Sequence, residues 1–333
     1  MRSVRHKLPM VLAVVLTLAG CASQPNNQIM LMPAPDVFDE GDWDPFTDRN
    51  PIKDIPYGGI LYATDREPAR EEARKITLLK ERPRDYPLQV SDVREVEILD
   101  RSINAFTDPL VVREQQELQS DQFVAKVNAK LKISSKKDIF IYLHGYKVVF
   151  ENPLLVASEL WHFLGYEGVF IAFAWPSTPS TWAYFSDLET AVLSAGNLRR
   201  LIQTLAEKTD ARRIHIIGYS AGTRVVTRAL DQLALKYADP ACKDAAQELR
   251  IGHVILTGSD LDRHIFGSYL VDGMIDVAGY ITNYASAKDK DLCMSRWHFG
   301  RDRLGHNLDG GMSEPAEKYL RHNRNLIIVN ATD

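Results

Sequence analysis

The chain has little that would indicate a metal site or a disulfide-bonded fold. It contains only three cysteines among 333 residues, and no cysteines or histidines follow the short spacings of zinc sites. A cluster of basic residues is also missing, because lysine and arginine are scattered among aspartate and glutamate and the formal net charge is −4. We therefore expect no metal, no cofactor and no nucleic-acid partner. Internal repeats are absent as well.

A hydrophobic run long enough for export, but too short for a stable transmembrane span, lies in residues 1–21 behind a basic start. It ends in Leu18-Ala-Gly-Cys21, which resembles a bacterial lipobox. The resemblance implies diacylation of Cys21 and removal of residues 1–20. A plain signal peptide with an accidental cysteine is the alternative. Ala22 follows the cysteine, and by resemblance to Gram-negative lipoproteins this implies the outer membrane, with the protein facing the periplasm.

Processing would remove three of the 40 basic residues and leave 37 against 44 acidic ones, a charge of −7. An acidic protein at a membrane depends on its lipid and not on electrostatic attraction. Residues 21–55 are rich in Pro, Asn and Asp and are predicted to form a disordered tether. One principal domain, residues 56–333, should follow. In the periplasm Cys242 and Cys293 could pair, although two solitary thiols are the favoured expectation.

From residue 138 onwards, apolar β-branched runs alternate with helical patterns. Strands are predicted at residues 138–143, 168–174, 213–217, 252–257, 281–286 and 325–330, and helices at 154–164, 188–206, 222–236 and near 263–274. Upstream we expect a strand at 58–65, small antiparallel strands at 88–90 and 93–99, and a helix at 114–131. Strands this apolar, alternating with helices, predict a mostly parallel, doubly wound sheet in a three-layer αβα sandwich, covered on both faces.

The most informative stretch is Gly218-Tyr-Ser-Ala-Gly222, which ends a β-branched run and is followed by a helical pattern. This is the G-x-S-x-G nucleophile elbow, in which a strained turn lifts the serine above the sheet edge. The five letters alone also fit an ordinary glycine turn. The surrounding strand, turn and helix favour Ser220 as a nucleophile, with the first helical amides pointing to where an oxyanion would form.

Together with other stretches, this motif resembles the α/β-hydrolases and, within that fold, a bacterial family of hydrolases of unknown function. The matching stretches are Tyr62-Ala-Thr-Asp-Arg66, Phe140-Ile-Tyr-Leu-His-Gly-Tyr146, Ala172-Phe-Ala-Trp-Pro-Ser177, Gly218–Gly222 and Tyr284-Ala-Ser-Ala-Lys-Asp289. The resemblance covers roughly residues 58–331. It implies a fold and a reaction type, but no substrate.

The segment His144-Gly145-Tyr146 directly follows a predicted buried strand. In α/β-hydrolases this loop gives the second oxyanion donor, so we expect the amides of Tyr146 and Ala221 to form the oxyanion hole. By the same resemblance, His144 braces the loop and is not the base. The segment 175–182, which contains two tryptophans, is expected to border the pocket or simply to pack.

A serine nucleophile needs a general base and an acid that orients the base, and the chain order in this fold is Ser, Asp, His. We prefer Asp289, after strand 281–286, as the acid. Asp260, after strand 252–257, is the alternative, although helix capping would also explain Asp260 and Asp262.

The family places its histidine just beyond the last strand, but the sequence ends at Asp333. His298, His306 and His322 precede that strand in polar segments, and each alone is expected to be solvated. Three explanations remain open: an incomplete C-terminus, a base displaced to His306 or His322, or loss of catalysis. An incomplete C-terminus would leave the last strand exposed and prone to aggregation.

The sequence therefore predicts a lipid-anchored serine hydrolase that cleaves a carboxylic ester or thioester through an acyl-enzyme. Its substrate would be a small-molecule or lipid ester. The alternative is a non-catalytic envelope protein that binds a partner with its hydrolase pocket. A histidine able to reach Ser220 would discriminate between the two. The sequence predicts no oligomeric state.

Overall fold

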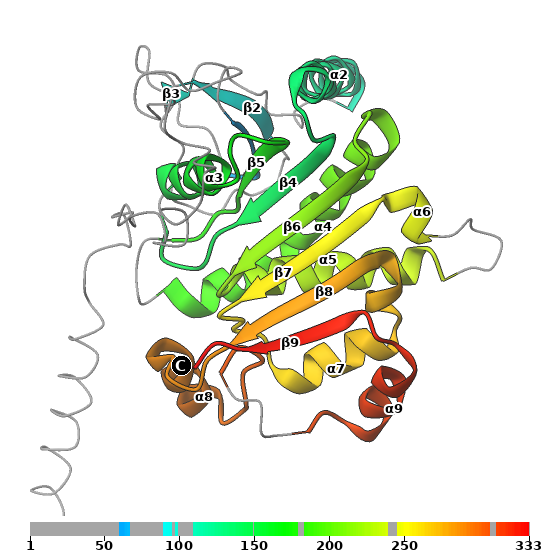
Figure 1. The fold of residues 1–333 in the computed structure, drawn as a ribbon. Coiled ribbons are helices and arrows are strands. Elements are labelled where there is room, and N and C mark those ends of the chain that lie inside the picture. Colours follow the sequence, from blue (N-terminus) through cyan, green and yellow to red (C-terminus); the bar gives the residue numbers. More distant parts are fainter. Residues whose placement is uncertain are drawn as a thin grey trace, which may run out of the picture.

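The computed structural model describes residues 60–66, 89–94, 97–98, 109–148, 150–178, 183–238, 245–306 and 311–332. The predicted export signal, Cys21, the tether and Cys242 lie outside these ranges. The centre of the protein is a nine-stranded sheet with the order β3-β2-β1-β5-β4-β6-β7-β8-β9 (Figure 1).

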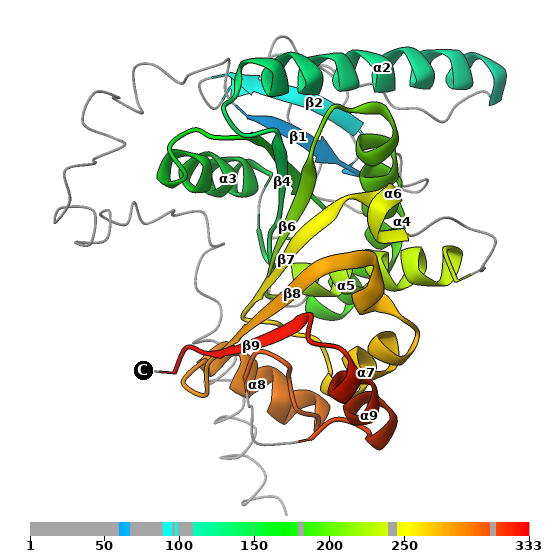
Figure 2. The same cartoon turned by 45° about the vertical axis from the view of Figure 1, so that its right-hand side comes forward.

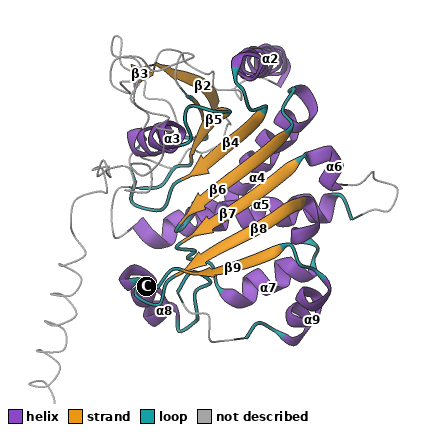
Figure 3. Cartoon of the chain, in the orientation of Figure 1, coloured by secondary structure: helices purple, strands orange, loops and turns teal. Residues whose placement is uncertain are grey.

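The strands and helices follow the order that the sequence predicts (Figure 3). The strands are β1 (Leu61–Thr64), β2 (Gln89–Arg94), β3 (Glu97–Ile98), β4 (Asp138–Leu143), β5 (Val169–Ala174), β6 (Arg213–Tyr219), β7 (Ile251–Thr257), β8 (Ala278–Ala285) and β9 (Leu326–Asn330). The helices are α2 (Pro109–Ile133), α3 (Glu151–Phe163), α4 (Tyr184–Lys208), α5 (Gly222–Lys236), α6 (Ala245–Leu249), α7 (Arg263–Val271), the 3₁₀ helix η4 (Met274–Val277), α8 (Lys290–Phe299) and α9 (Glu314–His322).

Seven of the strands, β1 and β4 to β9, run parallel, whereas β2 pairs antiparallel with both β1 and β3. The predicted parallel sheet and its small antiparallel extension are therefore confirmed. Most predicted boundaries hold within a few residues. The helix predicted near 263–274 divides into α7 and η4, because Gly273 adopts a left-handed conformation at φ +88° and interrupts the helix. None of the helices within the described ranges is long and apolar enough to cross a membrane.

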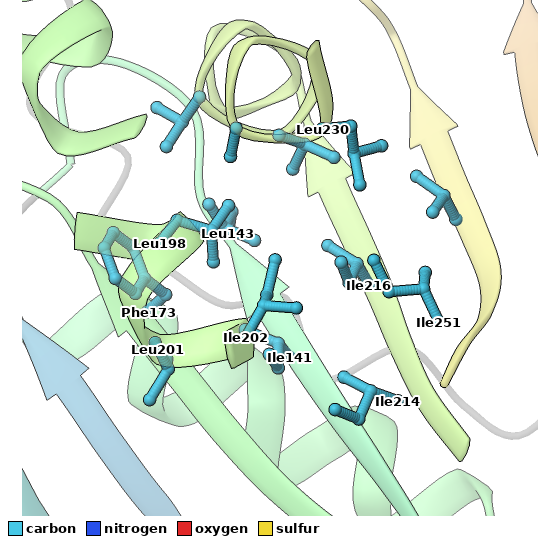
Figure 4. Packing of buried hydrophobic residues seen from close by; sticks show 14 of the residues in the cluster. Ile141, Leu143, Phe173, Leu198, Leu201, Ile202, Ile214, Ile216, Leu230 and Ile251 are labelled. Carbon is cyan, nitrogen blue, oxygen red and sulfur yellow. The ribbon is translucent and has the colours of Figure 1, made fainter. Parts of the chain in front are cut away.

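The main core lies between the sheet and the helices α4 and α5. Apolar side chains of β4 and β6, such as Ile141 and Ile216, pack against Leu198 and Ile202 of α4 and Leu230 of α5 (Figure 4). All five are fully buried. Burial of one such side chain stabilises the fold by about 1.5–3 kcal/mol, so this layer holds the elbow between β6 and α5 firmly in place.

The opposite face of the sheet is covered on one half. There α3 packs against β4 and β5 (Figure 2). Leu154 and Trp161 of α3 belong to the buried cluster on this face. On the half formed by β6 to β9, the described helices leave large side chains exposed. Tyr219, Tyr280, Tyr284 and Ile327 are 44%, 47%, 38% and 42% exposed. Within the described residues, the second helical layer is thus confined to part of the sheet, and β9 forms its edge.

Candidate active site

Ser220 lies in the turn between β6 and α5, as the elbow motif predicts. Its φ of +50° is left-handed, a conformation that a serine adopts at a cost. The Ser220 amide donates a hydrogen bond of 2.9 Å to the carbonyl oxygen of Thr257. The Ser220 carbonyl oxygen accepts from the amide and the hydroxyl of Thr223, at 3.1 and 2.6 Å. The end of β7 and the first turn of α5 therefore hold the strained turn from two sides.

The glycines on either side of Ser220 have no room for a side chain. A Cβ at Gly218 would lie 3.0 Å from Val226 Cγ2 in α5. A Cβ at Gly222 would lie 2.9 Å from the carbonyl oxygen of Leu143 and would collide with that of His144. The elbow motif thus reflects two close approaches, one to its own helix and one to the loop after β4.

The loop after β4 lies directly beside the nucleophile. A Cβ at Gly145 would stand 3.0 Å from Ser220 Cβ and 3.5 Å from Ser220 Oγ. Ala221, the residue before α5, is fully buried and no side-chain cap satisfies this end of the helix. The structure therefore brings Ala221 and the Gly145-Tyr146 segment to the same place, and their service as oxyanion donors stays a prediction.

His144 is built into the fold behind this loop. It is fully buried, with Nδ1 2.7 Å from the carbonyl oxygen of Gly145 and Nε2 3.0 Å from that of Trp175. Burial lowers the pKa of His144 to about 3, so the ring is neutral and donates to one of the two oxygens. A bracing role fits these contacts. Trp175, which could have bordered the pocket, is fully buried and stacks on the His144 ring.

Asp289 lies at the same edge of the sheet as Ser220. Its Oδ1 accepts a 2.9 Å hydrogen bond from the amide of Leu292 and caps α8. Gly258 lies between Asp289 and the ring of Tyr219. A Cβ on Gly258 would be 3.6 Å from Asp289 Oδ2 and 3.7 Å from the ring of Tyr219. Burial, together with the Asp289 charge, raises the pKa of Tyr219. One carboxylate oxygen of Asp289 thus faces the neighbourhood of the elbow.

Asp260 is the centre of a buried polar cluster. It accepts hydrogen bonds from the Tyr184 hydroxyl and, at 2.6 Å, from Ser295 Oγ. The guanidinium groups of Arg224 and Arg303 each approach it to 3.6 Å. Tyr184 and Arg303 come from segments that sequence reasoning did not connect with the site, and no local pattern signals their meeting. Both carboxylate oxygens of Asp260 are occupied, which leaves Asp289 the more available acid.

The capping interpretation is right for one of the two aspartates in this loop and wrong for the other. Asp262 caps α7, since its Oδ1 accepts from the amides of His264 and Ile265 at 2.8 and 3.1 Å. Asp260 caps none of the described helices, because its side chain turns into the cluster with Tyr184. Two aspartates of the same loop, separated by Leu261, therefore have different roles.

His306 is buried, contrary to the expectation that it is solvated. Only 8% of it is exposed, and its Nδ1 is buried with no hydrogen-bond partner in the described part of the chain. The preceding Gly305 donates to the carbonyl oxygen of Ser259 and accepts from the amide of Ser286, both at 2.9 Å. The His306 loop therefore packs against the loops that follow β7 and β8, next to the elbow.

The other candidate bases are less favourably placed. His322 is exposed at the end of α9, with its Nδ1 2.9 Å from the carbonyl oxygen of Lys318. His322 precedes β9, whereas Ser220 follows β6. The two residues therefore lie at opposite ends of the parallel strands. The side chain of His298 is outside the described residues. Among the histidines whose rings are described, none hydrogen-bonds to Ser220 or Asp289.

The position just beyond β9, where the family resemblance places the base, lies beside the Asp289 loop. The amide of Ala331 donates to the carbonyl oxygen of Ala285 at 2.7 Å, and the amide of Ala287 donates to Thr332 Oγ1 at 3.1 Å. In the sequence, β9 is followed by Ala331, Thr332 and Asp333.

Cys293 is a free thiol exposed on α8, and its pairing with Cys242 is not tested because Cys242 lies outside the described residues. In the ranges given above, no three His, Cys, Asp or Glu side chains gather in a way that could hold a metal ion. The described site therefore consists of Ser220, the two loops beside it and the acids Asp260 and Asp289.

Comparison with known proteins supports the fold of this site. Residues 119–323 match a family model described as an alpha/beta hydrolase of unknown function (DUF900). No curated protein matches the chain. Among solved structures, Thermogutta terrifontis esterase 2 phosphoramylated by tabun is similar, with 13% identity and a TM-score of 0.32 over 60% of this chain and 73% of that one. A likeness this weak carries no argument about function.

Proposed function

Since the chain belongs to the alpha/beta hydrolase family of unknown function (DUF900), we propose that it is a serine hydrolase that cleaves a carboxylic ester or thioester. One observation carries the proposal: Ser220 is held at φ +50° between β6 and α5, and the loop after β4 packs directly against it. A Cβ on Gly145 of that loop would lie only 3.0 Å from Ser220 Cβ. An ordinary turn has no need of a strained serine or of a second loop packed against it.

In the proposed reaction, Ser220 Oγ attacks the carbonyl carbon while a general base takes its proton. The carbonyl oxygen becomes an oxyanion that accepts hydrogen bonds from the amides of Tyr146 and Ala221. The C–O or C–S bond then breaks, and the leaving alcohol or thiol takes the proton from the base. Water attacks the resulting acyl-enzyme by the same steps, releases the acid and regenerates Ser220.

We assign the acid to Asp289 and, within this chain, the base to His306. Asp289 has an oxygen facing the elbow region, whereas both oxygens of Asp260 are engaged. Nδ1 of His306 is buried and has no hydrogen-bond partner among the described residues, and its loop is hydrogen-bonded to the loops after β7 and β8. Service as a base requires the ring to turn toward Ser220, and catalytic hydrogen bonds of this kind often tighten only when substrate binds.

A second candidate function is non-catalytic binding of a partner at the hydrolase pocket. The observation that favours it is the one described above: no described histidine ring is hydrogen-bonded to Ser220 or to Asp289. A serine without a base is a poor nucleophile, so the two functions differ in whether Ser220 is activated.

The sequence pattern Leu18-Ala-Gly-Cys21 supports a lipid anchor on Cys21, and we propose that the protein is held in the bacterial cell envelope by this lipid. A location at the outer membrane, facing the periplasm, follows from Ala22 by the same resemblance. The hydrolase would then act on small-molecule or lipid esters near the membrane.

A fluorophosphonate probe tests the proposed function, because it reacts with an activated serine and not merely with an exposed one. Wild-type protein should be labelled at Ser220, as peptide mass mapping would show, and Ser220→Ala should not be labelled. Absence of labelling in folded wild-type protein would favour the binding function. Labelling that persists in Ser220→Ala would remove this serine from the mechanism.

A further inference from the structure

The loop of residues 144–148, here called the oxyanion loop, is fastened at both of its ends. Its first end is held by His144 and Trp175, as described above. We propose that Arg66 and Asp187, two buried charged residues from distant parts of the chain, are positioning residues that hold its second end against Ser220. The inference rests on the proposed function in one respect, namely that the Tyr146 amide in this loop serves the reaction.

Asp187 holds the loop through its backbone. It lies in the first turn of α4 and is 1% exposed. Its carboxylate accepts a hydrogen bond from the amide of Lys147, and both of its oxygens accept from the amide of Thr178, at 3.1 and 2.9 Å. Lys147 has a φ of +62°, a conformation that costs on the order of 1 kcal/mol in a residue other than glycine. The carboxylate thus stabilises a strained residue next to Tyr146.

Arg66 holds the following residue. It is 1% exposed just beyond β1, and its Nη2 donates a 3.0 Å hydrogen bond to the carbonyl oxygen of Val148. Ser177 completes the attachment, since its hydroxyl lies 3.0 Å from the Val148 amide and 3.2 Å from the Val148 carbonyl oxygen. Three separate segments therefore converge on the two residues that follow Tyr146.

The two charged groups also act on one another. Burial raises the pKa of Asp187 to about 6, and the positive charge of Arg66 opposes this rise. A buried arginine is costly unless an acid and hydrogen-bond acceptors surround it. The stretch Tyr62–Arg66 lies outside the residues that match the family model, and these contacts give its last residue a role in the fold.

Replacement of Asp187 by Ala tests the inference through the loop itself. Amide hydrogen exchange in the peptide that contains residues 145–148 should become at least about tenfold faster, because the Lys147 amide loses its acceptor. Labelling of Ser220 by the fluorophosphonate should become at least about tenfold slower, as for an enzyme whose oxyanion donor is misplaced. Asp187→Asn keeps one acceptor oxygen and should give intermediate values in both measurements.

Asp231→Ala is the matched control. Asp231 is equally buried, and it pairs with Arg228 at 2.8 Å on α5. Its described interactions, with Arg228 and with the charge of Asp272, include no residue of the oxyanion loop. This variant should lose stability while exchange at 145–148 and labelling of Ser220 stay at wild-type rates. If Asp187→Ala does not fold, Asp187→Asn and Ser177→Ala carry the test.

Wild-type exchange rates at 145–148 in all of the folded Asp187 variants would overturn the inference. Equal acceleration in Asp231→Ala would also overturn it, since the effect would then be general destabilisation. Failure of wild-type protein to react with the probe would count against the proposed function alone, because the exchange measurement needs no catalysis.

Discussion

His144 and Trp175 hold each other in both directions. The indole Nε1 of Trp175 donates to the carbonyl oxygen of His144 at 2.7 Å, while the imidazole Nε2 of His144 lies 3.0 Å from the carbonyl oxygen of Trp175. Their rings stack with centroids 5.2 Å apart. The end of β4 is thereby tied to the end of β5, and the oxyanion loop starts from a fixed point.

Trp175→Phe should keep the stacking but remove the indole donor. We expect a loss of about 1 kcal/mol in the free energy of unfolding and slower probe labelling of Ser220, because the carbonyl group of His144 loses its partner. Trp161→Phe is the control, since the indole nitrogen of Trp161 is buried and has no hydrogen-bond partner in the described part of the chain. Denaturant unfolding and labelling rates measure both. Equal labelling rates in the two variants would count against the tie.

Gly222→Ala should displace the elbow. The added Cβ would clash with the carbonyl oxygens of Leu143 and His144. Both are backbone atoms, so the clash cannot be relieved by a change of side-chain rotamer. Labelling of Ser220 should be nearly abolished and stability should fall by more than about 1 kcal/mol. Gly196→Ala in α4 is the matched control: its Cβ would meet nothing within 4 Å, so the helix should gain up to about 1 kcal/mol. A normally labelled Gly222→Ala protein would contradict the packing described here.

His306→Ala should reduce ester hydrolysis and probe labelling to background if His306 is the base, because loss of a triad histidine costs on the order of a millionfold in turnover. His322→Ala should change neither hydrolysis nor labelling, since His322 and Ser220 lie at opposite ends of the parallel strands. Hydrolysis of p-nitrophenyl esters measures both. Turnover that survives His306→Ala would show that the base comes from elsewhere, and absence of turnover in the wild type would favour the binding function.

The pH dependence of stability should carry a contribution from Asp65. Burial raises the pKa of Asp65 from 3.8 to about 6, so the folded protein binds a proton there more tightly than the unfolded chain does. This contribution is fully present below pH 3.8 and is lost as the pH rises through about 6.

Asp65→Asn keeps the shape of the side chain without a titrating group. Its free energy of unfolding relative to wild type should therefore increase between about pH 4 and 7, by about 2 to 3 kcal/mol in total. Urea unfolding across this range measures the difference. A difference that does not vary with pH would mean that Asp65 is not titrating as described.

Cys21→Ala should release the protein from the membrane in a Gram-negative host. The unmodified product has no lipid, and its acidic character gives it no attraction to anionic membranes. Membrane fractionation and intact mass of the mature protein are the measurements. An unmodified Cys21 in the wild-type protein would contradict the proposed anchor.

Local sequence determined the elements around the nucleophile. The strand at 138–143 and the helix at 222–236 have the predicted bounds, because β-branched runs and helical periodicity report local backbone preference and one-sided burial. The elbow was also predictable, since its two glycines are required by contacts with the adjoining helix and loop. Asp262 as a helix cap follows from neighbours only two and three residues away.

Only the tertiary structure decided the surroundings of the site. The burial of His306, in a segment rich in arginine, aspartate and glycine, arises because Gly305 pairs with Ser259 and Ser286. The hydrogen bond from Tyr184 to Asp260 joins residues 76 positions apart, and the hydrogen bond from Arg66 to Val148 joins residues 82 positions apart. Such contacts between distant residues depend on the order of the strands in the sheet. The hydrophobic periodicity of a short segment predicts a helix or a strand, but it does not predict that order.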